Sequence, residues 1–186
     1  MNIINDVEAI YDRGEMSYPL STYVDRDIWK RRFQENFPDK YIDNLTDFNY
    51  NKCFTVCIHL SDANAGIGSK EFDEYIIKNG VVYEALIEIS ALFPYCILKY
   101  SKYYFLEGEI ENECRDIPYC KEHTKFDQEI RDILDRSKLI LLDDEVLMTE
   151  IPGKSLELRE APVSAYNCLF QDTYAYYPYT SKGRYY

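Results

Sequence analysis

The clearest alternation of apolar and polar positions runs through residues 52–60, KCFTVCIHL. Successive side chains of an extended chain point to opposite faces, which here carry Phe54, Val56, Ile58 and Leu60 against Cys53, Thr55, Cys57 and His59. The β-branched and aromatic content of the segment suits the same conformation. Residues 52–60 are therefore predicted to form a buried strand.

Four other segments place their apolar residues at helical spacing, namely a helix from residue 3 that ends near Gly14 and helices over residues 27–37, 70–78 and 126–138. Pro38 stops the second, because proline cannot continue the hydrogen-bond ladder of a helix. Ser69 can cap the start of the third, and Gly80 suits a cap at its end. The pattern predicts four helices with one apolar side each.

Residues 81–107 carry the largest apolar and aromatic mass with the fewest charges. From residue 82 to residue 93 the apolar positions recur at helical spacing, and Glu84 and Glu88 share the opposite stripe. Pro94 ends this pattern, and aromatic and β-branched residues follow it. We expect a buried helix that leads into a buried strand from Tyr95 onward, with both carboxylates at a solvent-facing edge or around a shared cation.

The structure of the remaining segments is predicted from the residues that interrupt helices and strands and from short apolar runs. Residues 15–24 are expected to be a loop, residues 39–51 a further helical turn with a loop, and residues 107–122 an exposed polar excursion. Residues 139–142, 145–151, 155–160 and 163–170 are expected to be short strands, although the last could be helical. The helices between the strands at residues 52–60 and 95–100 could form a right-handed crossover between parallel strands.

These elements predict an α+β fold, in which a mixed sheet is covered by helices. The length of 186 residues favours a single domain over residues 1–172. Residues 173–186 form a tyrosine-rich tail with no usable period, which we expect either to pack as an extended arm or to be loose.

The net charge of the protein favours some classes of binding partner and disfavours others. The net charge is −12, and residues 107–160 alone contribute −8 through 16 acidic and 8 basic residues. Such a field repels nucleic acid and attracts a basic protein. With no secretion signal and no apolar stretch of bilayer length, we expect a cytoplasmic protein that does not enter membranes and whose six cysteines are reduced.

An acidic comb follows the central stretch at alternate positions, comprising Glu107, Glu109, Glu111 and Glu113. If this segment is extended, period-two spacing places all of these carboxylates on one side. They could serve as a solubilising edge that discourages aggregation. They could also form a docking surface for a basic protein, with aromatic anchors at Tyr103, Tyr104 and Tyr119.

Candidates for catalysis and for ligand binding are few. His59 lies at a strand end near Asp62 and shares a face with Cys57, so a base, a carboxylate and a thiol could meet. Cysteine and histidine gather in two groups, Cys53 with Cys57 and His59, and Cys114 with Cys120 and His123. Neither group contains the close cysteine pair typical of zinc sites, so no metal is expected. The turn at residues 66–70, GIGSK, lacks the phosphate-loop order, and no cofactor is expected.

The sequence therefore favours an acidic, cytoplasmic binding or inhibitory protein. Its concrete form is an immunity or antitoxin protein that neutralises a basic, nuclease-type toxin, because opposite charge accelerates such an encounter. Two alternatives stay open. One is a small enzyme that uses His59 with Asp62 or Cys57, and the other is a structural or phage-type accessory protein. The pattern does not predict the oligomeric state.

Overall fold

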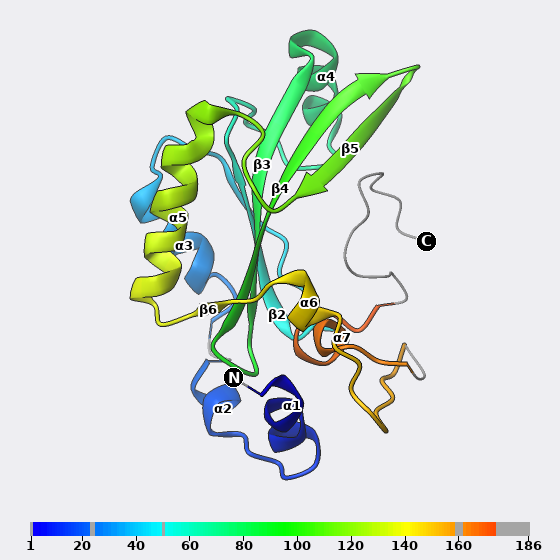
Figure 1. Cartoon of the computed structure of the whole chain (residues 1–186). Helices are drawn as coiled ribbons and strands as arrows, with labels where there is room; N and C mark the ends of the chain where they lie inside the picture. The colour runs from blue at the N-terminus through cyan, green and yellow to red at the C-terminus, as the bar shows by residue number, and fades with distance from the viewer. Residues whose placement is uncertain (1, 23–24, 50, 159–161, 174–186) are drawn as a thin grey trace.

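An antiparallel sheet forms the centre of the computed structural model, which describes residues 2–22, 25–49, 51–158 and 162–173 (Figure 1). Its strands lie in the order of the chain: β1 (Ile42–Asn44), β2 (Cys53–His59), β3 (Val81–Ser90), β4 (Tyr95–Leu106) and β5 (Glu109–Arg115). A short sixth strand, β6 (Ile140–Leu141), runs parallel to the start of β4. The sheet is therefore mixed, and the α+β class predicted from the sequence is confirmed.

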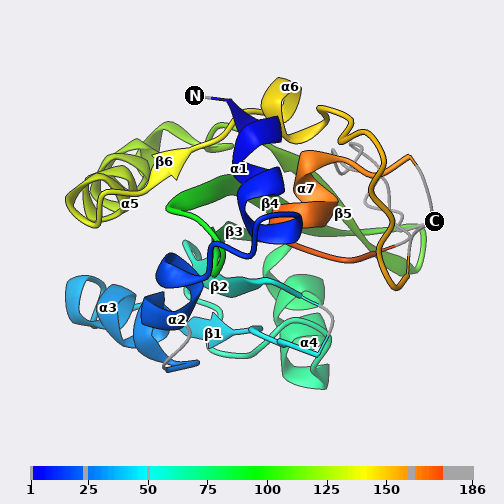
Figure 2. The ribbon, with the colours of Figure 1, turned by 90° about the horizontal axis from the view of Figure 1, so that it is seen from below.

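Helices cover both faces of this sheet. One face packs against α3 (Ile28–Asn36) and α5 (Thr124–Arg136), in a core that includes Phe33, Ile87 and Ile130. The other face is covered at one end by α4 (Lys70–Asn79) and at the opposite end by α1 (Ile3–Tyr11), α6 (Asp144–Leu147) and α7 (Ala165–Leu169). Figure 2 shows α1 lying beside α7. The short elements α2 (Ser17–Thr22) and η1 (Lys121–His123) complete the described chain.

Five local predictions are confirmed, namely the helices α1, α3, α4 and α5 and the strand β2. At α4 the expected caps are present. The Ser69 hydroxyl accepts a hydrogen bond from the Phe72 backbone N–H at 3.2 Å, and Gly80 ends the helix with a φ of +87°. A side chain rarely adopts that φ, so glycine is favoured there.

The helix expected over residues 82–93 is wrong, because these residues form most of β3 and the turn into β4. Val82, Leu86 and Ile89 fit a helical stripe, but the alternation of Ala85, Ile87 and Ile89 fits a strand equally well. The β-branched residues and the pairing of β3 with both β2 and β4 decide the outcome. The strand β3 lies between β2 and β4 and is antiparallel to both, so β2 and β4 run in the same direction, but the crossover made of helices alone is wrong.

Other corrections are local. Residues 15–24 contain α2, residues 42–44 within the segment 39–51 form β1, and residues 107–122 include the strand β5. Part of the strand expected at 145–151 is α6, and the open choice at 163–170 resolves to the helix α7. No regular element forms over residues 155–158, whereas residues 159–160 and the tail from residue 174 fall outside the described parts of the chain.

The β4–β5 hairpin lies at the end of the sheet that α4 covers, packs one face against α4 through Tyr103 and Ile110, and directs its tip away from the helices (Figure 1). Its tip is a two-residue turn in which Glu107 has a φ of +52° and Gly108 a φ of +97°. Two positive φ values are the hallmark of the type I′ turn, whose twist matches that of the flanking strands. The turn therefore fixes the register in which β5 pairs with β4.

Candidate functional site

The acidic comb lies on β5, at an edge of the sheet. Glu109, Glu111 and Glu113 pair in register with Leu106, Tyr104 and Lys102 of β4, and all of these side chains lie on the same face of the hairpin. Glu107 sits in the turn instead of the strand. The structure therefore brings together three of the four predicted carboxylates, and β5 pairs with no strand on its outer side among the described residues.

None of the comb carboxylates forms an ion pair with another described residue. Lys102 lies directly opposite Glu113, but its ammonium is placed 4.4 Å from the centre of the Tyr104 ring. The Tyr104 hydroxyl donates a hydrogen bond to Glu113 at 3.0 Å, and this bond raises the pKa of the phenol. The carboxylates thus keep most of their capacity to meet cations from outside.

The predicted aromatic anchors separate. Tyr104 shares the face of the comb, and Tyr119 lies on the same side, with its ring against Tyr83 and under the Arg115 guanidinium at 3.8 Å. Tyr103 points to the opposite face, where its ring meets Phe72 of α4 at 5.3 Å. The structure therefore does not place Tyr103 with the rest of the predicted docking surface.

On the opposite face of the sheet, two carboxylates of β3 are buried, each only 1% exposed. Glu84 Oε1 lies 2.8 Å from His59 Nε2, and His59 Nδ1 lies 2.9 Å from the carbonyl oxygen of Ala63. The carbonyl can only accept, so Nδ1 carries a proton. The contact between Nε2 and Oε1 falls outside hydrogen-bond geometry, so the two buried side chains meet through a close polar contact alone.

Among the described residues, Glu88 receives hydrogen bonds on only one of its two carboxylate oxygens. Its Oε1 atom accepts hydrogen bonds from the Gln171 amide and, at 3.4 Å, from the Tyr166 hydroxyl. Its Oε2 atom is buried and has no hydrogen-bond partner. Burial raises the pKa of this carboxyl to about 7, although the two donors and the positive charge of Lys99 act in the opposite direction.

A cavity of about 210 Å³ is lined by both of these carboxylates. Its other polar walls come from Asn51, Thr55, Ser101 and Gln171. Leu45 and Ile67 also line it and are 41% and 37% exposed, so the cavity opens toward solvent on their side. The site is concave and combines apolar side chains with convergent polar groups, as small-molecule sites do.

The catalytic arrangement expected around His59 does not form with Asp62. The Asp62 side chain is 95% exposed and pairs with Lys40 at 3.6 Å, whereas His59 is fully buried and faces Glu84. Cys57 shares the face of His59 as predicted, but burial raises the pKa of its thiol well above the usual value. A protonated thiol is a poor nucleophile.

The remaining sequence candidates carry no ligand chemistry. Among the described residues there is no group of three or more cysteine, histidine or acidic side chains that could hold a metal ion. At the turn over residues 66–70, the Asp43 carboxylate approaches Gly66 so closely that an added Cβ would lie 2.8 Å from its Oδ2 atom. The Ser69 hydroxyl already accepts a bond from the start of α4. This turn therefore holds a carboxylate where a bound anion would be repelled.

Comparison of this chain with protein-family models, with curated protein sequences and with solved structures finds no match. The acidic comb on β5 and the cavity lined by Glu84 and Glu88 must therefore be interpreted from their own geometry. The helices of the described chain are all too short or too polar to cross a bilayer.

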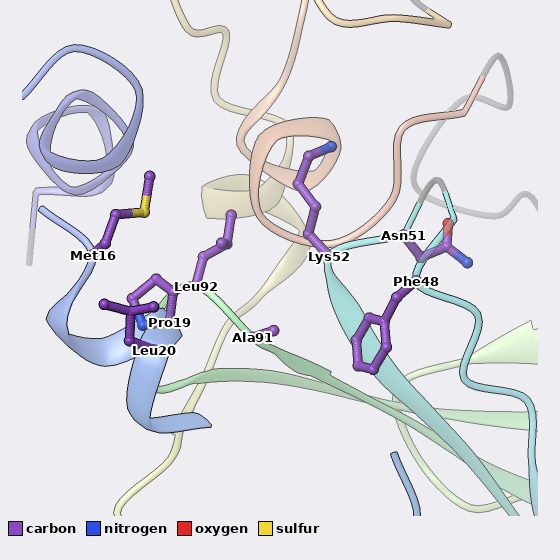
Figure 3. A pocket seen from close by; sticks show the side chains of 8 residues that line it. All are labelled: Met16, Pro19, Leu20, Phe48, Asn51, Lys52, Ala91 and Leu92. Carbon is purple, nitrogen blue, oxygen red and sulfur yellow. The ribbon is translucent and has the colours of Figure 1, made fainter. Parts of the chain in front are cut away.

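A second cavity, of about 420 Å³, lies between α2 and the starts of β2 and β4 (Figure 3). Its walls are mainly apolar, with Met16 and Leu20 exposed on the side of α2. Lys52 is its one ionisable residue among the described residues that line it, and in Figure 3 this side chain points toward α7, where the ammonium donates to the Asn167 carbonyl at 3.4 Å. This groove offers packing surface but no convergent polar groups.

Sequence reasoning missed the role of Glu84 and Glu88 because it assigned them to an exposed helical stripe. A usable signal was present, since residues 84, 86 and 88 also share one face of a strand. The hydrogen bond from Gln171 to Glu88 could not be predicted in this way, because it depends on how the segment after α7 packs beside the start of β2.

Proposed function

We propose that this acidic protein binds a positively charged protein through the protruding β4–β5 hairpin. The observation that supports the proposal most strongly is the placement of Glu109, Glu111 and Glu113 on one face of an edge strand, with no internal ion pair among the described residues. Like charges side by side on a strand are unfavourable unless they are solvated or meet positive charge. A basic partner would supply that charge.

The hairpin also offers an apolar contact area beside the charges. Leu106 at its tip is 50% exposed and shares the face of the comb with Tyr104, whereas Phe105, 45% exposed, points to the opposite face. Interfaces commonly combine aromatic anchors at the centre with a polar rim. The unpaired outer side of β5 could in addition accept a strand from the partner.

The concrete form of the proposal is an immunity or antitoxin protein that acts in the cytoplasm and neutralises a basic, nuclease-type toxin. A nuclease must attract phosphate, so its substrate-binding surface is positively charged. An acidic inhibitor is steered toward that surface, and the association rate should fall as salt screens the attraction. The net charge of −12 suits this role.

The test is affinity capture from the native host with three forms of the protein. The wild type is compared with Glu109→Lys combined with Glu111→Lys, and with a control that reverses the exposed Asp132 and Asp135 of α5 to lysine. Both double variants change the net charge by the same amount, so only position differs. We expect the wild type and the control to capture one small basic protein in a salt-sensitive manner, and the hairpin variant to lose it. Equal capture by the two double variants, or capture that is insensitive to salt, would contradict the proposal.

A further inference from the structure

The cavity beside β3 holds a negative charge that the surrounding protein only partly compensates. Glu84 faces His59, but Glu88 receives only neutral donors, both on the same oxygen atom. Lys99 projects from β4 on this face of the sheet, yet its ammonium is bonded to Asp116 and Asp144. The Glu88 Oε2 atom has no hydrogen-bond partner among the residues that the structure describes.

An unpartnered carboxylate oxygen in a buried position is costly, because it has lost its hydration without gaining a donor. A ligand that carries N–H donors and a positive charge would donate a hydrogen bond to this oxygen and also compensate the negative charge of the carboxylate. Tyr103 adds an aromatic ring to the wall of the same cavity, and ring faces attract organic cations. The chemistry of the wall therefore selects a cation over an anion or a neutral molecule.

The size of the cavity limits that cation. Its volume of about 210 Å³ is below the range of about 300–1,000 Å³ that is usual for drug-sized ligands. The space suits a short aliphatic chain that ends in one charged group. Leu86, on β3 between the two carboxylates, supplies apolar contact for such a chain.

We propose that this cavity binds a small organic cation, an ammonium or guanidinium compound, with the Glu88 carboxylate as its counter-charge. The site is distinct from the proposed docking surface, because the carboxylates of β3 and those of β5 lie on opposite faces of the sheet. The two proposals can therefore fail separately.

The experiment is a calorimetric titration of the whole chain with n-butylammonium at pH 8, where Glu88 is mainly ionised. n-Butanol and butyrate serve as neutral and anionic probes of similar size, and potassium chloride tests for a simple metal cation. The key variant is Glu88→Gln, which keeps the shape of the side chain and removes the charge. Its matched control is Glu113→Gln, which removes one carboxylate from the opposite face.

We expect n-butylammonium to bind the wild type and the Glu113→Gln variant equally, and to bind Glu88→Gln about tenfold or more weakly, as loss of a charge-assisted hydrogen bond requires. n-Butanol and butyrate should bind at least as weakly as the cation binds Glu88→Gln. A second variant, Leu86→Phe, leaves the carboxylate intact but fills the cavity, and it should abolish binding.

The inference is overturned if n-butylammonium does not bind the wild type, if it binds Glu88→Gln as tightly as the wild type, or if potassium or butyrate binds more tightly. It is also overturned if Leu86→Phe binds n-butylammonium without loss. Circular dichroism of each variant tests whether it folds as the wild type does. If Glu88→Gln does not fold, the Leu86→Phe result decides.

Discussion

Two sets of glutamates, each on one face of its strand, have different surroundings in this molecule. On β3, Glu84 and Glu88 are buried on the face that carries His59, under the helices α4 and α7. On β5, Glu109 is exposed and Glu111 and Glu113 are partly exposed at an unpaired edge. Period two places each set on one face of its strand, so the pattern of glutamates alone does not distinguish them.

The difference follows from the position of each strand in the sheet. β3 is central and is hydrogen-bonded on both sides, so a polar side chain on it must find a partner inside the protein or in a bound ligand. β5 is an edge strand in a protruding hairpin, where water or another macromolecule can solvate charge. A buried carboxylate therefore affects stability, at a cost where its partners are incomplete, and can bind a ligand, whereas an exposed one contributes to association.

Charge reversal should separate the two sets most strongly. Glu84→Lys places an unpaired cation against His59 in a buried site, and we expect it to lower the free energy of unfolding by about 3–5 kcal/mol or to prevent folding. Glu111→Lys on the edge strand should change it by no more than about 0.5 kcal/mol. Urea denaturation of both variants is the measurement, and losses of similar size would show that the two strands do not differ in this way.

The pH dependence of stability should come next in size. The pKa of Glu88 is about 7 in the folded chain, against 4.5 for the ordinary side chain, so the folded state binds a proton more tightly than the unfolded state. The stability that proton binding by Glu88 supports is present in full below pH 4.5 and is lost as the pH rises to about 7. The loss amounts to roughly 3 kcal/mol, from about 1.4 kcal/mol per pKa unit.

In Glu88→Gln this component of the pH dependence should disappear, and at pH 8 the variant should be more stable than the wild type. Denaturation curves at pH 5 and pH 8 test this expectation, with Glu113→Gln as the control that keeps the dependence of the wild type. A Glu88→Gln variant that loses as much stability as the wild type between these pH values would exclude burial of an ionisable group at this position.

A smaller effect is expected at the tip of the hairpin. Gly108→Ala introduces a Cβ at a φ of +97°, which side chains rarely adopt, although nothing else lies within 4 Å of the new atom. We expect a loss of about 1 kcal/mol in the free energy of unfolding, from backbone strain alone. Hydrogen exchange should show faster exchange of the β4–β5 amides in this variant and little change in those of β2. Equal acceleration in both strands would indicate that the hairpin is not a separate unit.

The smallest effect should occur at the neighbouring turn position. Glu107 adopts a φ of +52°, which asparagine tolerates better than glutamate does. Glu107→Asn should therefore stabilise the protein by a few tenths of a kcal/mol. Because Glu107 lies outside the strand, the substitution should leave partner capture intact. Loss of capture would extend the docking surface to the turn.

The spacing of apolar residues and the capping residues were sufficient to predict the elements whose apolar positions fit only one period, helical or extended. The strand β2 alternates without interruption, and α4 has Ser69 at its start and Gly80 at its end, so both were predicted with nearly correct limits. In β3 the apolar residues satisfy both the helical and the extended period, and its two glutamates suggested exposure. The assignment depended on pairing with β2 and β4, which a local pattern does not contain.

The candidate sites were predictable to different degrees for the same reason. The comb was found because period two is a local property, and only the placement of Glu107 and Tyr103 required the turn and the register. The contact of His59 with Glu84 joins residues from neighbouring strands, and that of Glu88 with Gln171 joins β3 to the end of the chain. Sequence spacing contains no information on either contact.

The most direct test of the distinction between the two strands is an NMR titration of the Glu88 side-chain carboxyl in the folded protein. A midpoint near pH 7 would show that this carboxylate is buried on β3 with an incomplete set of partners, as the structure requires. A midpoint at the ordinary value of 4.5 would show that water reaches it, and would contradict both its burial and its proposed role in binding a cation.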